Sequence, residues 1–184
     1  MSGKHDSLSV AEQVAAIMQK LGMEPVVIGA LALATHHYIR FTQYVDLGVD
    51  ADLQLIRDLQ KRLNADGFTT ALHEPDMDDP LGGVLNISGD FGLVQVLNFG
   101  GRFPVVIQDA LAAKPPTLTE SGTLRIVPLA QLVALKLYAG GLKSKVDIVE
   151  LLRRNPDADL SAIRKVCDQC RLKGLEEVLA ELGD

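Results

Sequence analysis

Two polar features interrupt the apolar runs of residues 26–50, and they limit strongly what this chain can fold into. The first is Gly29-Ala30, which closes a run of three Val and Ile residues and opens a run rich in Leu and Ala. This order predicts a strand that turns through small residues into a helix. The free backbone N–H groups of such a helix start can bind a phosphate, although a tight turn that serves only the backbone remains the alternative.

The second feature is an alternating strand over residues 42–50. Apolar residues at 45, 47 and 49 alternate with Tyr44, Asp46, Gly48 and Asp50, as a half-buried strand requires. Asp46 and Asp50 therefore face the same side of the strand. Four residues of extended chain separate them by roughly 13 Å, too far for one ion that each carboxylate would bind at about 2 Å.

The order of strand, Gly-small turn, Ala-rich helix, Arg-x-Thr and acidic strand resembles the AbiEii-type nucleotidyltransferase-like family of the polymerase-beta superfamily. In that family two aspartates in the pattern Thr-x-Asp-hydrophobic-Asp hold Mg²⁺ against a nucleoside triphosphate. Arg40 and Thr42 match the pattern and Asp46 falls on its second aspartate, but Tyr44 stands at the first. The family's third carboxylate, on a later strand, falls on Gln95 in this chain.

The resemblance implies roles for the matching residues. Lys136, Lys143 and Asp147 match the family's Lys-hydrophobic-x-Ala and Lys-Asp-x-x-Asp motifs, with Ser144 in place of an aspartate. Tyr44 and Gln95 are expected to line the cleft as replacements for metal-binding carboxylates, which leaves Asp46 as the candidate metal ligand. The residues implied as catalytic are Asp46, Lys136 and Asp147, and those implied as nucleotide-binding are Gly29, Ala30, Arg40, Thr42 and Lys143.

Several of these side chains also have a purely structural interpretation. Lys136 and Asp147 can form a buried ion pair between two helices instead of facing a nucleotide, and Arg40 can pair with a carboxylate. Two-metal phosphoryl transfer needs a cluster of negative charge to hold and orient the ions. Asp46 alone does not supply that cluster, so efficient Mg²⁺-dependent transfer is not expected.

The composition fits an ordered globule without an extended nucleic-acid surface. Of the 184 residues 47% are apolar, the formal net charge is −6 and the sequence pI is about 5.2. No cluster of Lys and Arg reaches the size of a DNA- or RNA-binding face, and an aromatic content of 4% offers few stacking platforms. Because no signal-like segment or apolar run of about 18 residues is present, a cytoplasmic protein without a membrane span is expected.

The expected fold is α+β: a small mixed sheet of nucleotidyltransferase type flanked by helices, with a helical C-terminal half. The acidic, turn-rich residues 73–83 are expected to form a solvated loop that can overhang a site, and Ser9 is expected to cap the first helix. Residues 1–103 form the predicted nucleotidyltransferase-like core, and residues 104–184 form the helical part packed on it. Strands are predicted over 26–28, 42–50, 68–72, 84–88 and 93–98, a short extended piece over 123–127, and helices over 10–21, 31–38, 53–64, 105–113, 129–139, 143–154, 160–172 and 175–182.

Three functions remain open from the sequence. The leading hypothesis is a nucleotidyltransferase-like protein with a degenerate metal site, which binds a nucleotide or a protein partner such as an antitoxin without efficient transfer. The second is an active enzyme of toxin-antitoxin type that uses Mg²⁺ and a nucleoside triphosphate. The third is a non-catalytic interaction module that uses the Leu-rich C-terminal helices.

Overall fold

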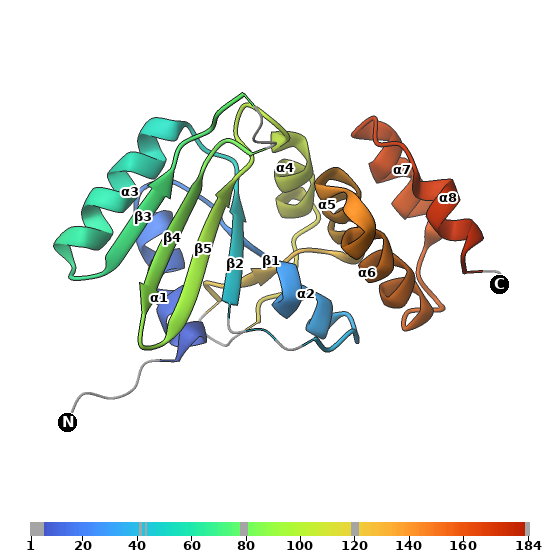
Figure 1. Ribbon diagram of the computed structural model, residues 1–184, viewed down its shortest axis with the longest axis horizontal. Helices are drawn as coiled ribbons and strands as arrows, with labels where there is room; N and C mark the ends of the chain where they lie inside the picture. The colour runs from blue at the N-terminus through green and yellow to red at the C-terminus, as the bar shows by residue number, and fades with distance from the viewer. Residues whose placement is uncertain (1–5, 41, 43, 78–80, 119–121, 183–184) are drawn as a thin grey trace.

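The computed structural model describes residues 6–40, 42, 44–77, 81–118 and 122–182, and over these ranges the chain forms a mixed six-stranded sheet flanked by helices (Figure 1). The α+β class expected from the sequence is thus confirmed. The strands are β1 (Val26–Ile28), β2 (Tyr44–Val49), β3 (Thr69–His73), β4 (Val84–Gly89), β5 (Gly92–Asn98) and β6 (Arg125–Ile126). The helices are α1 (Ser7–Lys20), α2 (Gly29–Thr35), α3 (Leu53–Ala65), α4 (Pro104–Ala112), α5 (Leu129–Ala139), α6 (Gly141–Arg153), α7 (Leu160–Gln169) and α8 (Leu175–Ala180).

The central pair of the sheet is β2 and β5. The strand order is β3-β4-β5-β2-β1-β6, with β2 parallel to β5 and antiparallel to β1. Residues of β2 alternate between the two faces of the sheet, so Val45 and Leu47 enter the core beside α1 while Asp46 faces the other way. The extended piece expected over residues 123–127 contributes β6, which pairs parallel with β1.

One face of the sheet is covered by α1 and α3, which lie together on the same side in Figure 1. Their inward side chains include Val14 and Met18 of α1 and Ile56 and Leu59 of α3, and all four are fully buried. Burying one such side chain contributes about 1.5–3 kcal/mol to folding. This layer anchors the half of the sheet that carries β2 and β5.

The C-terminal helices are organised around α5, which contacts α4, α6 and α7. Figure 1 shows α5 to α8 extending away from the β1 side of the sheet. Leu132, Val133 and Leu135 of α5 are buried, which explains why this helix lies between the sheet and the outer helices. Among the described residues no helix combines the length and the hydropathy that a bilayer span requires.

The bounds of the first two helices differ from the sequence expectation. The first helix begins at Ser7, because the side chain of Asp6 accepts a hydrogen bond from the Ser9 backbone N–H at 2.7 Å and so acts as the cap in place of Ser9. The second helix runs from Gly29 to Thr35 instead of 31–38. It ends early because His37 adopts a positive φ of 67°, which a right-handed helix does not accommodate.

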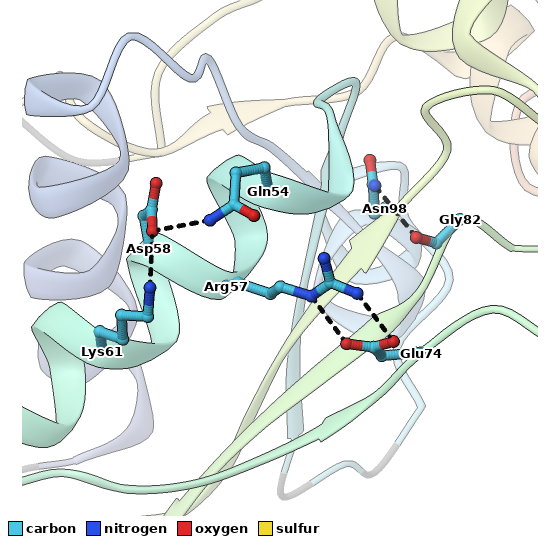
Figure 2. A network of polar contacts seen from close by, with 7 residues as sticks. All are labelled: Gln54, Arg57, Asp58, Lys61, Glu74, Gly82 and Asn98. Atoms are coloured by element: carbon cyan, nitrogen blue, oxygen red, sulfur yellow. Dashed lines mark hydrogen bonds and ion pairs between the residues drawn. The ribbon is translucent and has the colours of Figure 1, made fainter.

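Asn98, at the end of β5, joins three backbone segments through one buried amide. Its Oδ1 accepts from the N–H groups of Ala51 and Gly100, and its Nδ2 donates to the carbonyls of Ala51 and Gly82. Figure 2 shows the Asn98 amide directed at Gly82, in the same region as the ion pair between Arg57 and Glu74. The amide therefore fixes the segment that leads into β4.

We predict that Asn98→Ala lowers the free energy of unfolding by roughly 2–4 kcal/mol, because it leaves several buried backbone groups without partners. Chemical denaturation of the parent and the variant measures the difference. Asn64→Ala is the matched control, since the Asn64 side chain accepts a bond from the Thr70 hydroxyl at the surface. An equal effect of both substitutions would contradict the role assigned to Asn98.

Candidate functional site

A pocket of about 330 Å³ lies where the end of β1, the middle of β2 and β5, and helix α5 meet. Its polar lining consists of Asp46 from β2, Gln95 from β5 and Lys136 from α5. Gly29, the first residue of α2, also borders it. The remaining lining is apolar or aromatic and comprises Ile28, Leu81, Leu97, Phe99, Leu132, Leu135, Tyr138 and Ala139.

The parallel pairing of β2 and β5 places Asp46 beside Gln95. The two residues are direct partners in the register, so their side chains project from the same face of the sheet. On the next strand, Asn86 is the register partner of Gln95, and its Oδ1 accepts a hydrogen bond from Gln95 Nε2 at 2.7 Å. A polar row therefore crosses β2, β5 and β4 at the pocket.

The carboxylate of Asp46 packs directly against the turn at Gly29. A Cβ atom at position 29 would lie 1.9 Å from Asp46 Oδ2, and Gly29 has a φ of 71°, which side-chain-bearing residues rarely adopt. Glycine is thus required here both for space and for backbone conformation. The same contact means that a negative charge already lies beside the start of α2, where the sequence suggested a phosphate.

Burial dominates the electrostatics of Asp46. Loss of solvent raises the pKa of its carboxyl above the usual 3.8, and the positive charges of Lys136, Arg40 and Lys143 oppose that rise without cancelling it. The pocket therefore holds a carboxylate that is less well solvated than in water. A ligand that donates hydrogen bonds to it would relieve this desolvation.

Asp147 is buried and bound by two cations. Its oxygens accept two hydrogen bonds from Arg40 Nη1, at 2.9 and 3.1 Å, and one from Lys136 Nζ at 2.8 Å. Asp147 is only 2% exposed, whereas Lys136 also borders the pocket. Lys136, Asp147 and Arg40 thus form an ion-pair cluster, as their structural interpretation expects. Lys136 also lines the pocket with Asp46, and its positive charge opposes the rise in the pKa of that carboxyl.

The structure does not bring every residue singled out in the sequence into the pocket. Tyr44 is 51% exposed and is not among the described residues that line it. Thr42 bonds to the backbone of Tyr44 at the start of β2, and Ala30 is buried behind the turn. Lys143 is exposed in the first turn of α6, near enough to lower the pKa of Asp46.

The donor set of the pocket does not fit the two-metal site of a phosphoryl-transfer enzyme. Asp46 is the single carboxylate among the described residues that line the pocket, and its register partner Gln95 is a neutral amide. Over residues 6–40, 42, 44–77, 81–118 and 122–182 no three His, Cys, Asp or Glu side chains are grouped as metal ligands. Divalent ions in such sites need several oxygen ligands with negative charge.

The sequence analysis did not single out Leu81, Phe99 and Tyr138, which line the pocket, or Asn86, which accepts the hydrogen bond from Gln95. Tyr138 stacks on Phe103 with ring centroids 4.2 Å apart, which fixes its ring at the pocket. Residues 132, 135, 136 and 139 are spaced so that they share one face of α5. This spacing is the sequence signal that could have identified α5 as a wall of the pocket. Leu81 comes from the loop expected to overhang a site, and Asp78 and Asp79 of that loop lie outside the described residues.

No family model and no curated protein matches the sequence. Solved structures do match. The chain is similar to the solution structure of the antibiotic-resistance factor ANT(2″)-Ia, with a TM-score of 0.52 and 12% identity over 91% of this chain and 93% of that chain. It is also similar to ANT(2″)-Ia in complex with adenylyl-2″-tobramycin, with a TM-score of 0.54 and 10% identity over 89% and 96% of the two chains.

At these identities the likeness shows the fold alone. It confirms the nucleotidyltransferase type of fold expected from the sequence, on which β2, β5 and α5 enclose the pocket. Membership of the AbiEii-type family stays a prediction.

We predict that Asp46→Asn leaves the protein equally stable or stabilises it by up to about 1 kcal/mol, because the substitution removes a charge that burial disfavours. The raised pKa sets the pH dependence. Below pH 3.8 the carboxyl is protonated in both states, and parent and variant should be alike. As the pH rises through the folded-state pKa, the parent should lose stability relative to the variant. A marked loss of stability in the variant at pH 7 would instead show that Asp46 has a stabilising ion-pair partner.

We predict that Asp147→Asn destabilises the protein by about 3–5 kcal/mol, because Arg40 and Lys136 would be left without their shared counter-charge. Thermal and denaturant unfolding measure the loss. Glu74→Gln breaks the exposed, bidentate pair with Arg57 and serves as the control, which should change stability far less. If Asp147→Asn and Glu74→Gln lose the same free energy of unfolding, the contacts of Asp147 with Arg40 and Lys136 do not stabilise the fold.

Proposed function

We propose that this protein is a nucleotidyltransferase-like binding protein with a degenerate metal site. It binds a nucleotide in the pocket between β2, β5 and α5, and it does not transfer nucleotidyl groups efficiently. The observation that carries this proposal is the register pair of Asp46 and Gln95. Gln95 is a neutral amide and Tyr44 is exposed to solvent, so Asp46 is the one carboxylate among the described residues that line the pocket. Metal-dependent nucleotidyl transfer needs a cluster of carboxylates to hold the ions.

Three features support a nucleotide as the ligand. Phe99 and Tyr138 offer aromatic surface to a base, and Lys136 and Lys143 place positive charge at and near the pocket. The same fold in ANT(2″)-Ia was solved in complex with adenylyl-2″-tobramycin, a ligand that contains a nucleotide part. Three contacts would support the pocket indirectly in this chain. Gly29 and Ala30 would shape the turn before α2, Arg40 would hold Asp147, and Thr42 would hold the start of β2.

A second candidate function is binding of a protein partner through the C-terminal helices. Leu142 is 79% exposed and Val146 is 48% exposed, and they lie four residues apart on α6, so they share one face. These two side chains would be the apolar contacts of such a partner. An antitoxin as the partner, and the toxin-antitoxin role with it, stay predictions.

The test restores the missing carboxylates. We predict that the parent binds nucleoside triphosphates with an affinity that does not depend on Mg²⁺, whereas the double variant Tyr44→Asp with Gln95→Asp gains Mg²⁺-dependent binding of at least about tenfold. Restored acids beside Asp46 repel one another without metal and bind the ion with it. Calorimetric titration of both proteins with each triphosphate, with and without millimolar Mg²⁺, measures the difference.

The exposed Gln169→Asp on α7 is the control, since it adds a carboxylate away from the pocket and should behave as the parent. Mg²⁺-dependent binding by the parent would support the active enzyme instead of the degenerate site. A parent that binds no nucleoside, monophosphate or triphosphate under either condition would favour the interaction module. A double variant that ignores Mg²⁺ would show that these positions do not form one site.

A further inference from the structure

The pocket is nearly neutral. Asp46 and Lys136 are the only ionisable side chains among the described residues that line it, apart from the phenol of Tyr138. Lys136 already donates to Asp147, which also binds Arg40. Counting these four charged groups, the positive and negative charges balance. Lys143, exposed near the pocket, adds one positive charge.

A nucleoside triphosphate does not suit this charge distribution. Its several negative charges are normally neutralised by Mg²⁺ and clustered cations, and the donor set here does not hold such ions. The Asp46 carboxylate also lies against Gly29 at the start of α2, where it would repel a phosphate. One phosphate monoester, by contrast, carries a charge of only about −1.5 to −2 at pH 7, and Lys143 offsets part of it.

The size and lining of the pocket suit the nucleoside part of such a ligand. A volume of about 330 Å³ lies at the small end of the roughly 300–1,000 Å³ range of ligand sites. The chain has only three Tyr and five Phe, yet Phe99, Phe103 and Tyr138 gather beside the pocket. The same pocket is lined by the acceptor Asp46 and the amide Gln95, which can bind hydroxyl groups.

We propose that the ligand is a nucleoside carrying at most one phosphate, bound in preference to the triphosphate. This inference rests on the proposed nucleotide-binding function and names its ligand class. The base packs against Phe99 and Tyr138, and ribose hydroxyls donate to Asp46 and bond to Gln95. A hydroxyl donor restores to the Asp46 carboxylate a hydrogen bond lost on burial, which a phosphate oxygen cannot do.

Calorimetric titration without Mg²⁺ tests the proposal on the full chain. The ligands are adenosine, guanosine, cytidine and uridine, their 5′-monophosphates and their 5′-triphosphates. We expect at least one nucleoside or monophosphate to bind about tenfold or more tightly than its own triphosphate. Comparable or tighter binding of the triphosphates would overturn the proposal and leave the proposed function standing. Absence of binding by all twelve ligands would overturn both.

Two variants test whether Asp46 causes the preference for a nucleoside or monophosphate over the triphosphate. Asp46→Asn should weaken nucleoside binding by about tenfold, because a neutral amide accepts a hydroxyl less strongly, and should weaken the triphosphate less or tighten it. The matched Asp50→Asn removes a charge that is bound to Gln108 outside the pocket, and it should leave both affinities unchanged. Thermal melts show whether each variant is folded. If folded Asp46→Asn binds nucleoside and triphosphate in the parent's ratio, the carboxylate does not select the ligand and the proposal fails.

Discussion

The buried carboxylate of Asp147 is the interaction on which the site depends. It joins the segment after α2, through Arg40, to α5, through Lys136, and it belongs to α6 itself. A buried carboxylate is stabilised when charged partners bind its oxygens, so these three segments are held in one arrangement. That arrangement places Lys136 at the wall of the pocket. The helical half of the chain is thereby oriented toward the sheet by charge as well as by apolar packing.

The parallel pairing of β2 with β5 decides the chemistry of the opposite wall. Asp46 and Gln95 are neighbours because the register makes them partners, and Gly29 admits the Asp46 carboxylate because it has no Cβ. One carboxylate with an amide beside it cannot gather divalent ions as a cluster of acids does. The raised pKa of Asp46 reflects the same shortage of solvent and partners. The wall is thus better suited to hydroxyl donors than to metal-bound phosphates.

The rim of the pocket depends on a neutral interaction. Asn98 binds the backbone at Ala51, Gly82 and Gly100, and this fixes the chain next to Leu81, which borders the pocket. The acidic loop thus reaches the site through an apolar residue, while the carboxylate of Glu74 is bound to Arg57 at the surface. A backbone anchored by one buried amide gives the pocket a defined edge without adding charge to it.

The sequence by itself determined the fold class and most elements, because apolar periodicity reports which face of a strand or helix is buried. Helix α5 and strands β4 and β5 were predicted within a residue or two from local patterns alone. The resemblance to the family also placed Asp46 and Gln95 at two positions where the family has metal-binding carboxylates. Only the tertiary structure decided that Asp147 binds Arg40 and Lys136, that Tyr44 turns to solvent and that Phe99 and Tyr138 border the pocket. These outcomes depend on contacts between residues that lie up to 107 positions apart in the sequence. Local sequence patterns do not show which distant segments pack together.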